Sequence, residues 1–472
     1  MSDFPFPFPA GDGDDDLPEQ MRRMMEAVSA QMQALGGMGA LFGAPVDGPV
    51  DWALARRVAL QVLAEGDRSP SDGEVAAHED ALRLAELWLD DSPLPSPPDA
   101  GRLVVGSRSV WLDGALEAMR PLMEPVAAAS AAAMAGLAQQ QLEEVDLDAM
   151  GLGPLAGMLQ GVDLGAAMRP MAAMLSGMHA GQALGELARQ LLTSTELTVP
   201  TAPRGVAVVL APNVREAFEG WDLDVREVTM TLALHEAAHR RLFHAVPWLE
   251  GHIHDLVGQF AAATEVDGAA LQAMAQDLMV DVDPDDPDSL EEAMRRAGEF
   301  RLEPTPTQRR VLERLQGVLA LVGGWARREV ARAAEDRLPG LARVDEVLRR
   351  RRATKGDGEQ TLERLLGLDL TPADETVGDL FVAAVEGARG PDTLRRALAH
   401  PENLPDAEEL ADPTRWLERL EAGSDVPDDA SALFGDLGDA PVEATADERI
   451  AEAREDDGPD AGDGPTDGPT PA

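Results

Sequence analysis

TLALHEAAHRRLFH, residues 231–244, contains the pattern H-E-x-x-H. Its two histidines, His235 and His239, are four residues apart, so on a helix they share one face and can bind the same metal ion. Glu236 follows the first histidine and is then placed to take a proton from an attacking water. The stretch therefore predicts a Zn²⁺ site with His235 and His239 as ligands and Glu236 as general base.

The residues around the motif predict a helix with a short strand before it. Asp224 and Glu227 match a capping box that opens a helix over 225–244, which must end before Pro247. The run 205–211 predicts a strand, and such a strand can orient an extended substrate by strand addition. The alternative is that the two histidines are only polar neighbours on a buried helix.

The third zinc ligand stays open, because a catalytic zinc needs three protein ligands and one free position. The longer pattern H-E-x-x-H-x-x-G-x-x-H is absent, since Leu242 and Ala245 occupy its glycine and last histidine positions. His244 is five residues after His239 and is expected to point away from the ligand face. The other candidates are histidines past the next turn and glutamates on later helices: His252, His254, Glu265, Glu291, Glu292, Glu299, Glu313 and Glu329.

Composition excludes several classes of function. The 472 residues include 40 Lys and Arg and 86 Asp and Glu, for a net charge of −46. Such a field argues against nucleic-acid or anionic-membrane partners. The chain has no cysteine, so any zinc must use histidine and carboxylate ligands, and we expect a cytoplasmic protein without a signal peptide. It also has no tyrosine, which removes one usual donor to an oxyanion.

Apolar periodicity predicts a mostly α-helical chain. We expect four regions: a disordered leader with a possible short helix, an N-terminal helical region, a region with the motif helix and the helices after it, and an acidic disordered tail. Their bounds are 1–50, 51–200, 201–422 and 423–472. Individual helices are predicted at 52–62, 75–88, 109–137, 290–300 and 307–336.

Small residues recur at helical spacing between 165 and 185, and they allow close approach of two helices. One interpretation is a membrane dimerisation motif, and the other is a tightly packed internal helix pair. Charged residues at Asp163, Arg169 and Glu186 interrupt the apolar surface, which favours the internal pair. No apolar run reaches the length needed to span a membrane.

Several ordered blocks resemble a known family. They are HEAAHRRLFHAVPWL at 235–249, RLQGVLALVGGW at 314–325, RLPGLARVDEVLRRRRA at 337–353, LLGLDL at 365–370 and HPENLPDAEELADP at 400–413. The blocks resemble an actinobacterial family of zincin-like, zinc-dependent metallopeptidases and hydrolases, whose sister branch is associated with deazaflavin coenzyme biosynthesis. The likeness covers most of 51–420. It implies a mostly helical zincin-like fold with a small β-ribbon near the motif helix, and a peptide or protein substrate.

The resemblance also implies a position for the third ligand. Relatives usually carry Glu-Gly-His or Glu-Gly-Trp on the long downstream helix, and that glutamate looks like a zinc ligand. Here the matching residues are Gly323, Gly324 and Trp325, and Gly323 has no side chain to offer. Two functions follow as hypotheses: a zinc-dependent metallohydrolase that cleaves peptides, and a degenerate pseudoenzyme that binds proteins or peptides. The two glycines would otherwise relieve crowding where helices cross.

Overall fold

A computed structural model describes residues 48–98, 102–144, 164–264, 304–353, 357–366 and 375–424. Almost all of the expected leader and tail, and the helix predicted at 290–300, lie outside the described residues. The chain divides between Trp416 and Leu417 into two units, and the elements up to α18 belong to the first. No helix in the described part of the chain is long and apolar enough to cross a membrane.

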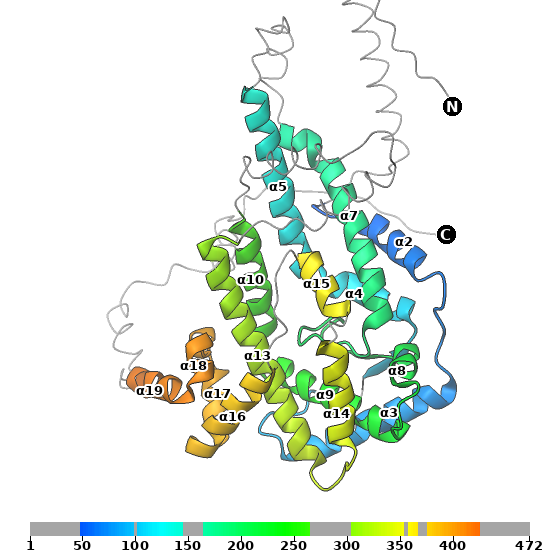
Figure 1. Cartoon of the computed structure of the whole chain (residues 1–472), viewed down its shortest axis with the longest axis vertical. Coiled ribbons are helices and arrows are strands. Elements are labelled where there is room, and N and C mark those ends of the chain that lie inside the picture. Colours follow the sequence, from blue (N-terminus) through cyan, green and yellow to red (C-terminus); the bar gives the residue numbers. More distant parts are fainter. Residues whose placement is uncertain are drawn as a thin grey trace, which may run out of the picture. The chain divides into compact units, whose positions relative to one another are not determined.

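The described residues are mostly helical, as predicted, with one small sheet (Figure 1). The elements before the motif helix are α2 (Trp52–Val62), α3 (Asp72–Trp88), β1 (Leu103–Gly106), α4 (Arg108–Ala118), α5 (Arg120–Glu144), α7 (Leu164–Gln190), β2 (Ala207–Leu210) and α8 (Ala211–Phe218). The motif helix and its successors are α9 (Val225–Ala245), α10 (Leu249–Ala262), α13 (Pro306–Ala334), α14 (Leu341–Ala353), α15 (Asp357–Leu366), α16 (Glu375–Arg389), α17 (Asp392–Ala397), α18 (Ala407–Ala411) and α19 (Pro413–Ser424).

The helix predicted over 109–137 is in fact two helices, which separate at Met119. Pro121 lies in the first turn of α5. Proline has no N–H to continue the hydrogen bonding of a preceding helix, but it fits a first turn, where that N–H has no partner anyway. The apolar periodicity continued across this break and concealed it.

The sheet pairs β1 with β2 in parallel, with Leu103 opposite Ala207 and Gly106 opposite Leu210. The strand at β2 was predicted, whereas β1 was not. The segment before β2 covers its other edge: Thr193 forms an antiparallel bridge with Val209, and Ser194 N–H donates to the Val208 carbonyl at 2.9 Å. Both edges of β2 therefore have partners, and the expectation that this strand would pair with a substrate is wrong.

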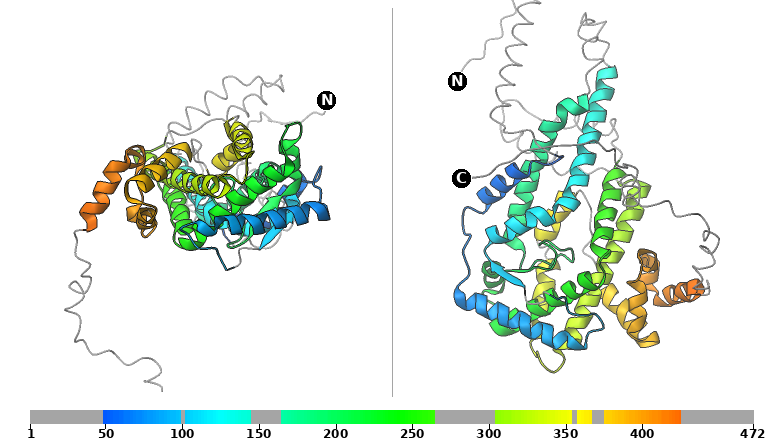
Figure 2. Two further views of the ribbon diagram at one scale, coloured as in Figure 1. Left: turned by 90° about the horizontal axis from the view of Figure 1, so that it is seen from below. Right: turned by 180° about the vertical axis from the view of Figure 1, so that it is seen from behind.

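Helix α7 lies along α2, and its small residues make the contact possible (Figure 2). A Cβ atom added to Gly181 would come within 2.4 Å of the Ala55 carbonyl oxygen, and one on Gly177 within 2.5 Å of the Asp51 carbonyl oxygen. The backbones touch directly, and Asp51 N–H donates to the Ala173 carbonyl at 2.9 Å. The small-residue stripe thus packs two helices of this chain against each other.

Helix α13 packs against α9, α10 and α16. It crosses α16 where Gly324 meets Gly378, and a Cβ on Gly324 would lie 2.2 Å from the carbonyl carbon of Gly378. Most residues from Val318 to Ala326 are buried. Relief of crowding at a helix crossing therefore accounts for Gly324.

The crossing predicts a difference between two glycines of α16. Gly378→Ala would place its Cβ 1.9 Å from the Ala320 carbonyl oxygen, and such overpacking should lower the free energy of unfolding by about 1–3 kcal/mol. A Cβ atom added to Gly387, in the same helix, would have no atom within 4 Å. Gly387→Ala should therefore raise that free energy by about 0.5–1 kcal/mol. Urea unfolding measures both, and equal effects would contradict this packing.

Candidate metal centre

Helix α9 begins and ends within one residue of its predicted limits. Asp224 caps it, as expected, by accepting the Arg226 N–H at 2.8 Å. The second half of the predicted capping box is wrong: Glu227 turns away from its own helix and accepts the Gly340 N–H at 2.9 Å. Glu227 therefore ties α9 to the start of α14, because Gly340 directly precedes that helix.

The two imidazoles lie one turn apart on α9, and both are largely buried. The side chain of His235 is 16 % exposed and His239 is 6 % exposed. His239 Nδ1 lies 2.8 Å from the His235 carbonyl oxygen. A carbonyl only accepts, so this nitrogen carries the proton and Nε2 keeps the lone pair that a metal requires. A hydrogen bond of this kind, from the other ring nitrogen to a backbone carbonyl, fixes the ring orientation in many histidine metal sites.

Nε2 of His235 is buried and makes no hydrogen bond within the described residues. Asp345 on α14 stands beside it, with its Oδ1 atom 3.5 Å away. A buried polar atom without a hydrogen bond requires an explanation, and a bound cation is one. The histidine pair and its neighbouring carboxylate are of the donor types that Zn²⁺ takes. Among the described residues, no three His, Asp or Glu side chains are already gathered in a metal-binding arrangement.

Several expected third ligands have other surroundings. Gly323 is buried within α13 and has no side chain. His252 on α10 packs edge-on against Trp248, and burial is the main cause that lowers the pKa of His252 and of His254. Glu313 is exposed, while Glu265, Glu291, Glu292 and Glu299 lie outside the described residues.

Glu329 is a buried carboxylate on α13 that forms an ion pair. It is 2 % exposed and accepts a hydrogen bond from Arg332, which also contacts Glu386. Burial is the main reason that the pKa of Glu329 lies above its usual value of 4.5, and Ser92 and Arg332 oppose the shift. Glu329 already has a cationic partner, so it is a weak candidate for binding a metal.

Glu236 is wholly buried and is held by the segment before β2. Its Oε1 accepts the Ser194 hydroxyl at 2.5 Å, and its Oε2 accepts the Thr195 hydroxyl at 2.7 Å and the Thr195 N–H at 3.2 Å. Burial raises the pKa of Glu236, and these hydrogen bonds partly oppose the shift. The carboxyl group of Glu236, the residue that follows His235 in the sequence, is therefore held in a single well-defined position.

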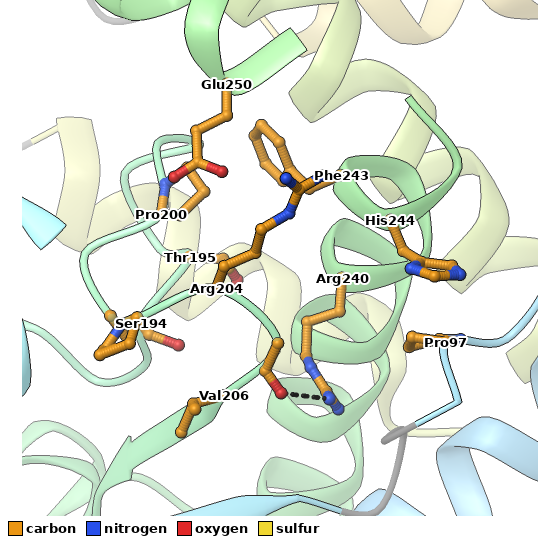
Figure 3. A pocket seen from close by; sticks show the side chains of 13 residues that line it. Pro97, Ser194, Thr195, Pro200, Arg204, Val206, Arg240, Phe243, His244 and Glu250 are labelled. Atoms are coloured by element: carbon orange, nitrogen blue, oxygen red, sulfur yellow. Dashed lines mark hydrogen bonds between the residues drawn. The ribbon is translucent and has the colours of Figure 1, made fainter. Parts of the chain in front are cut away.

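A pocket lies next to this network. Ser194 and Thr195 line it together with Arg204, Arg240 and Glu250 (Figure 3). Arg240 donates to the Gly205 carbonyl oxygen at 2.9 Å, the contact drawn in the figure. His244 also lines the pocket, on a face of α9 away from His235 and His239, as expected from its spacing. The pocket thus borders the two residues whose hydroxyl groups hold Glu236.

Sequence reasoning missed Ser194, Thr195 and Asp345. Ser194 and Glu236 are 42 residues apart, and no motif connects them. Asp345 lies in the block RLPGLARVDEVLRRRRA, and the resemblance of this block to the family did not indicate a functional residue in it. Only the packing of α14 and of the segment before β2 against α9 brings these groups together.

The chain belongs to the zincin-like metallopeptidase family, whose model matches residues 50–417. In fold it is similar to the crystal structure of a "putative hydrolase with a novel fold" from Chloroflexus aurantiacus, with a TM-score of 0.54 and 21 % identity. That match covers 79 % of this chain and 99 % of the other. No functionally curated protein matches the chain. The match confirms the predicted resemblance to zincin-like metallopeptidases and supports a metallohydrolase.

Glu329 predicts a pH effect on stability. Because its pKa is raised in the folded protein, the folded state holds a proton that the unfolded chain releases near pH 4.5. The resulting stabilisation is present below that pH and is lost as the pH rises through the folded pKa. Glu329→Gln stays neutral, so its free energy of unfolding should increase relative to that of wild type as the pH rises above 4.5.

Urea unfolding across this range tests the prediction, with Glu313→Gln, at an exposed position of the same helix, as the control. A difference between Glu329→Gln and wild type that does not change with pH would contradict it.

Proposed function

We propose that this protein hydrolyses peptide bonds, with Zn²⁺ held by His235 and His239 and with Glu236 as the general base. The observation that carries the proposal is the state of the histidine pair: both Nε2 atoms are buried, and the His235 carbonyl fixes the His239 ring. Family membership supports metallohydrolase chemistry. The peptide substrate and the use of zinc are our inference from that membership and from the residue pattern.

Each group has a defined task in this proposal. Bound Zn²⁺ would polarise the scissile carbonyl and increase the acidity of the attacking water. Glu236 would accept a proton from that water and later pass it to the leaving amine. Ser194 and Thr195 hold the carboxylate in place, and their hydroxyls would have to admit water from the pocket that they line.

The pocket suggests where a part of the substrate beyond the scissile bond would lie, since neither His235 nor His239 lines it. Its polar lining includes two arginines and one glutamate, Arg204, Arg240 and Glu250, while Phe243 and several prolines provide apolar contacts. Such a mixed lining suits a peptide, which presents both carbonyl groups and side chains. The expectations of a cytoplasmic location and of no nucleic-acid or membrane partner remain predictions from composition.

Zinc content tests the metal site directly. Purified wild-type protein should contain close to one Zn²⁺ per chain by elemental analysis, and His239→Ala should lose it because one of two imidazole donors is gone. His244→Ala is the matched control, since it removes an exposed histidine from the same helix and should retain zinc. A wild-type protein that binds no zinc at saturating supply would refute the proposed function.

Glu236→Gln separates binding from turnover. It should leave the metal bound and reduce peptide hydrolysis by at least about 100-fold, the usual range for loss of a general base. Assay against a mixed peptide library, with cleavage detected by mass spectrometry, does not require the substrate to be known. Unchanged cleavage in this variant would show that Glu236 is not the base.

The second candidate function is a pseudoenzyme that binds a protein or peptide. Two observations favour it. Gly323 offers no ligand, and both carboxylate oxygens of Glu236 accept hydrogen bonds from protein groups, Ser194 and Thr195, rather than being left open. If the protein is a scaffold of this kind, the wild type and His239→Ala should bind peptides equally well. Loss of peptide binding in His239→Ala would argue for the hydrolase instead.

A further inference from the structure

We propose that the pocket lined by Ser194 and Thr195 binds a carboxylate of the peptide substrate, and that Arg204 is the residue that recognises it. The carboxylate belongs either to an acidic side chain of the peptide or to its C-terminus. This inference rests on the proposed function, because it takes the pocket as part of the substrate site. It adds a chemical class to the peptide substrate.

A tight turn before β2 presents Arg204 to the pocket. The Val206 N–H donates to the Pro203 carbonyl at 3.0 Å and so closes the turn. Gly205 has a φ of 78°, which glycine adopts without strain at the third position of a type II turn. Arg240 on α9 also donates to the Gly205 carbonyl oxygen at 2.9 Å. The backbone that carries Arg204 is therefore fixed before any ligand binds, and such preorganisation lowers the cost of binding.

The donors of Arg204 are available to a ligand. Within the described residues its exposed side chain makes no hydrogen bond and no ion pair, although it lines the pocket. In Figure 3 this side chain extends from its turn toward Phe243, which lines the pocket together with three prolines. Charges beside such apolar walls are screened less than in bulk water. A guanidinium is a planar fork of donors that matches the two oxygens of a carboxylate.

The charged side chains that line the pocket also favour an anion. They are Arg204, Arg240 and Glu250, so the lining carries a formal charge of 2 − 1 = +1, in a chain whose net charge is −46. Arg240 lies 3.9 Å from the Glu86 carboxylate and holds the turn. Arg204 is therefore the cation of this pocket that has no structural task.

Glu250 opposes an anion in the pocket, but its position has another explanation. It lies in the first turn of α10, where the helix dipole favours a carboxylate. Burial lowers the pKa of His254 on the same helix, and the charge of Glu250 partly opposes that shift. Glu250 thus contributes to α10 without a ligand. We expect it to weaken the binding of a carboxylate, and removal of its charge should strengthen that binding.

The test compares four matched pools of random peptides that are acetylated at the N-terminus and carry no other charge. The first contains one glutamate and a C-terminal amide, the second has glutamine in place of that glutamate, and the third has lysine there. The fourth is the glutamine pool with a free C-terminal carboxylate. Retention on immobilised full-length Glu236→Gln protein, measured by mass spectrometry, reports binding without turnover. Cleavage of the same pools by the wild type reports hydrolysis.

The glutamate pool or the free-carboxylate pool should be retained about 10-fold better than the amidated glutamine pool, as expected for a charge-assisted pair. The pool that is retained identifies the source of the carboxylate. Added to Glu236→Gln, Arg204→Ala should abolish the preference, and Arg204→Glu should transfer it to the lysine pool. Glu250→Gln should increase it. Arg102→Ala is the matched control, because it removes an exposed arginine just before β1, outside the pocket, and should leave the preference unchanged.

Each outcome decides a separate point. Equal retention of all pools, with cleavage intact in the wild type, would overturn the carboxylate site and leave the proposed function standing. A preference that survives Arg204→Ala, a preference for the lysine pool, or no retention of any pool would also overturn the carboxylate site. Retention that depends on Arg204, without cleavage of any pool by zinc-supplied wild type, would support the carboxylate site and overturn the proposed hydrolysis. Near-ultraviolet circular dichroism checks that each variant is folded.

Discussion

The buried ion pair between Arg241 and Glu86 constrains the structure around α9. The Arg241 guanidinium is only 2 % exposed; it contacts the Glu86 carboxylate at 3.0 and 2.9 Å and donates to the carbonyl oxygens of Glu86 and Leu89. A buried charge without such partners would cost several kcal/mol. Helix α3 and the turn after it must therefore lie against this face of α9, and the rotation of α9 about its axis is fixed.

The other polar groups of α9 follow from that rotation. Each residue turns a helix by about 100°, so Glu236 and the two imidazoles point in directions different from that of Arg241. Glu236 meets Ser194 and Thr195, while His235 meets Asp345 on α14. A helix that places His235, Glu236 and Arg241 in largely buried positions within seven residues must be surrounded by elements with matching partners. Three separate segments provide them here.

Signals within short stretches of the sequence predicted the structural features that depend on neighbouring residues. The periodicity and the Asp224 cap gave α9 almost residue by residue, and the spacing of His235 and His239 placed both rings on one face. Contacts across long distances in the chain were not predictable in this way. Glu227 illustrates the limit, because its spacing from Asp224 matches a capping box, yet its carboxylate binds Gly340, 113 residues away. Strand β1 was also missed. Its apolar run is only three residues long, 103–105, whereas β2 lies within a longer apolar run, 206–211.

The helix crossing at Gly324 bears on the missing third ligand of the proposed metal site. The family resemblance implies a carboxylate at the position of Gly323, but in this chain the next residue of α13 touches the backbone of α16 at Gly378. The region is therefore packed for helix contact rather than for a ligand. A cation on His235 and His239 would be held by two successive turns of one helix, α9. Because a cation that binds only the folded state stabilises it, its binding would add to the contacts that already hold α9 in place, among them those that Glu227 and Val344 make between α9 and α14.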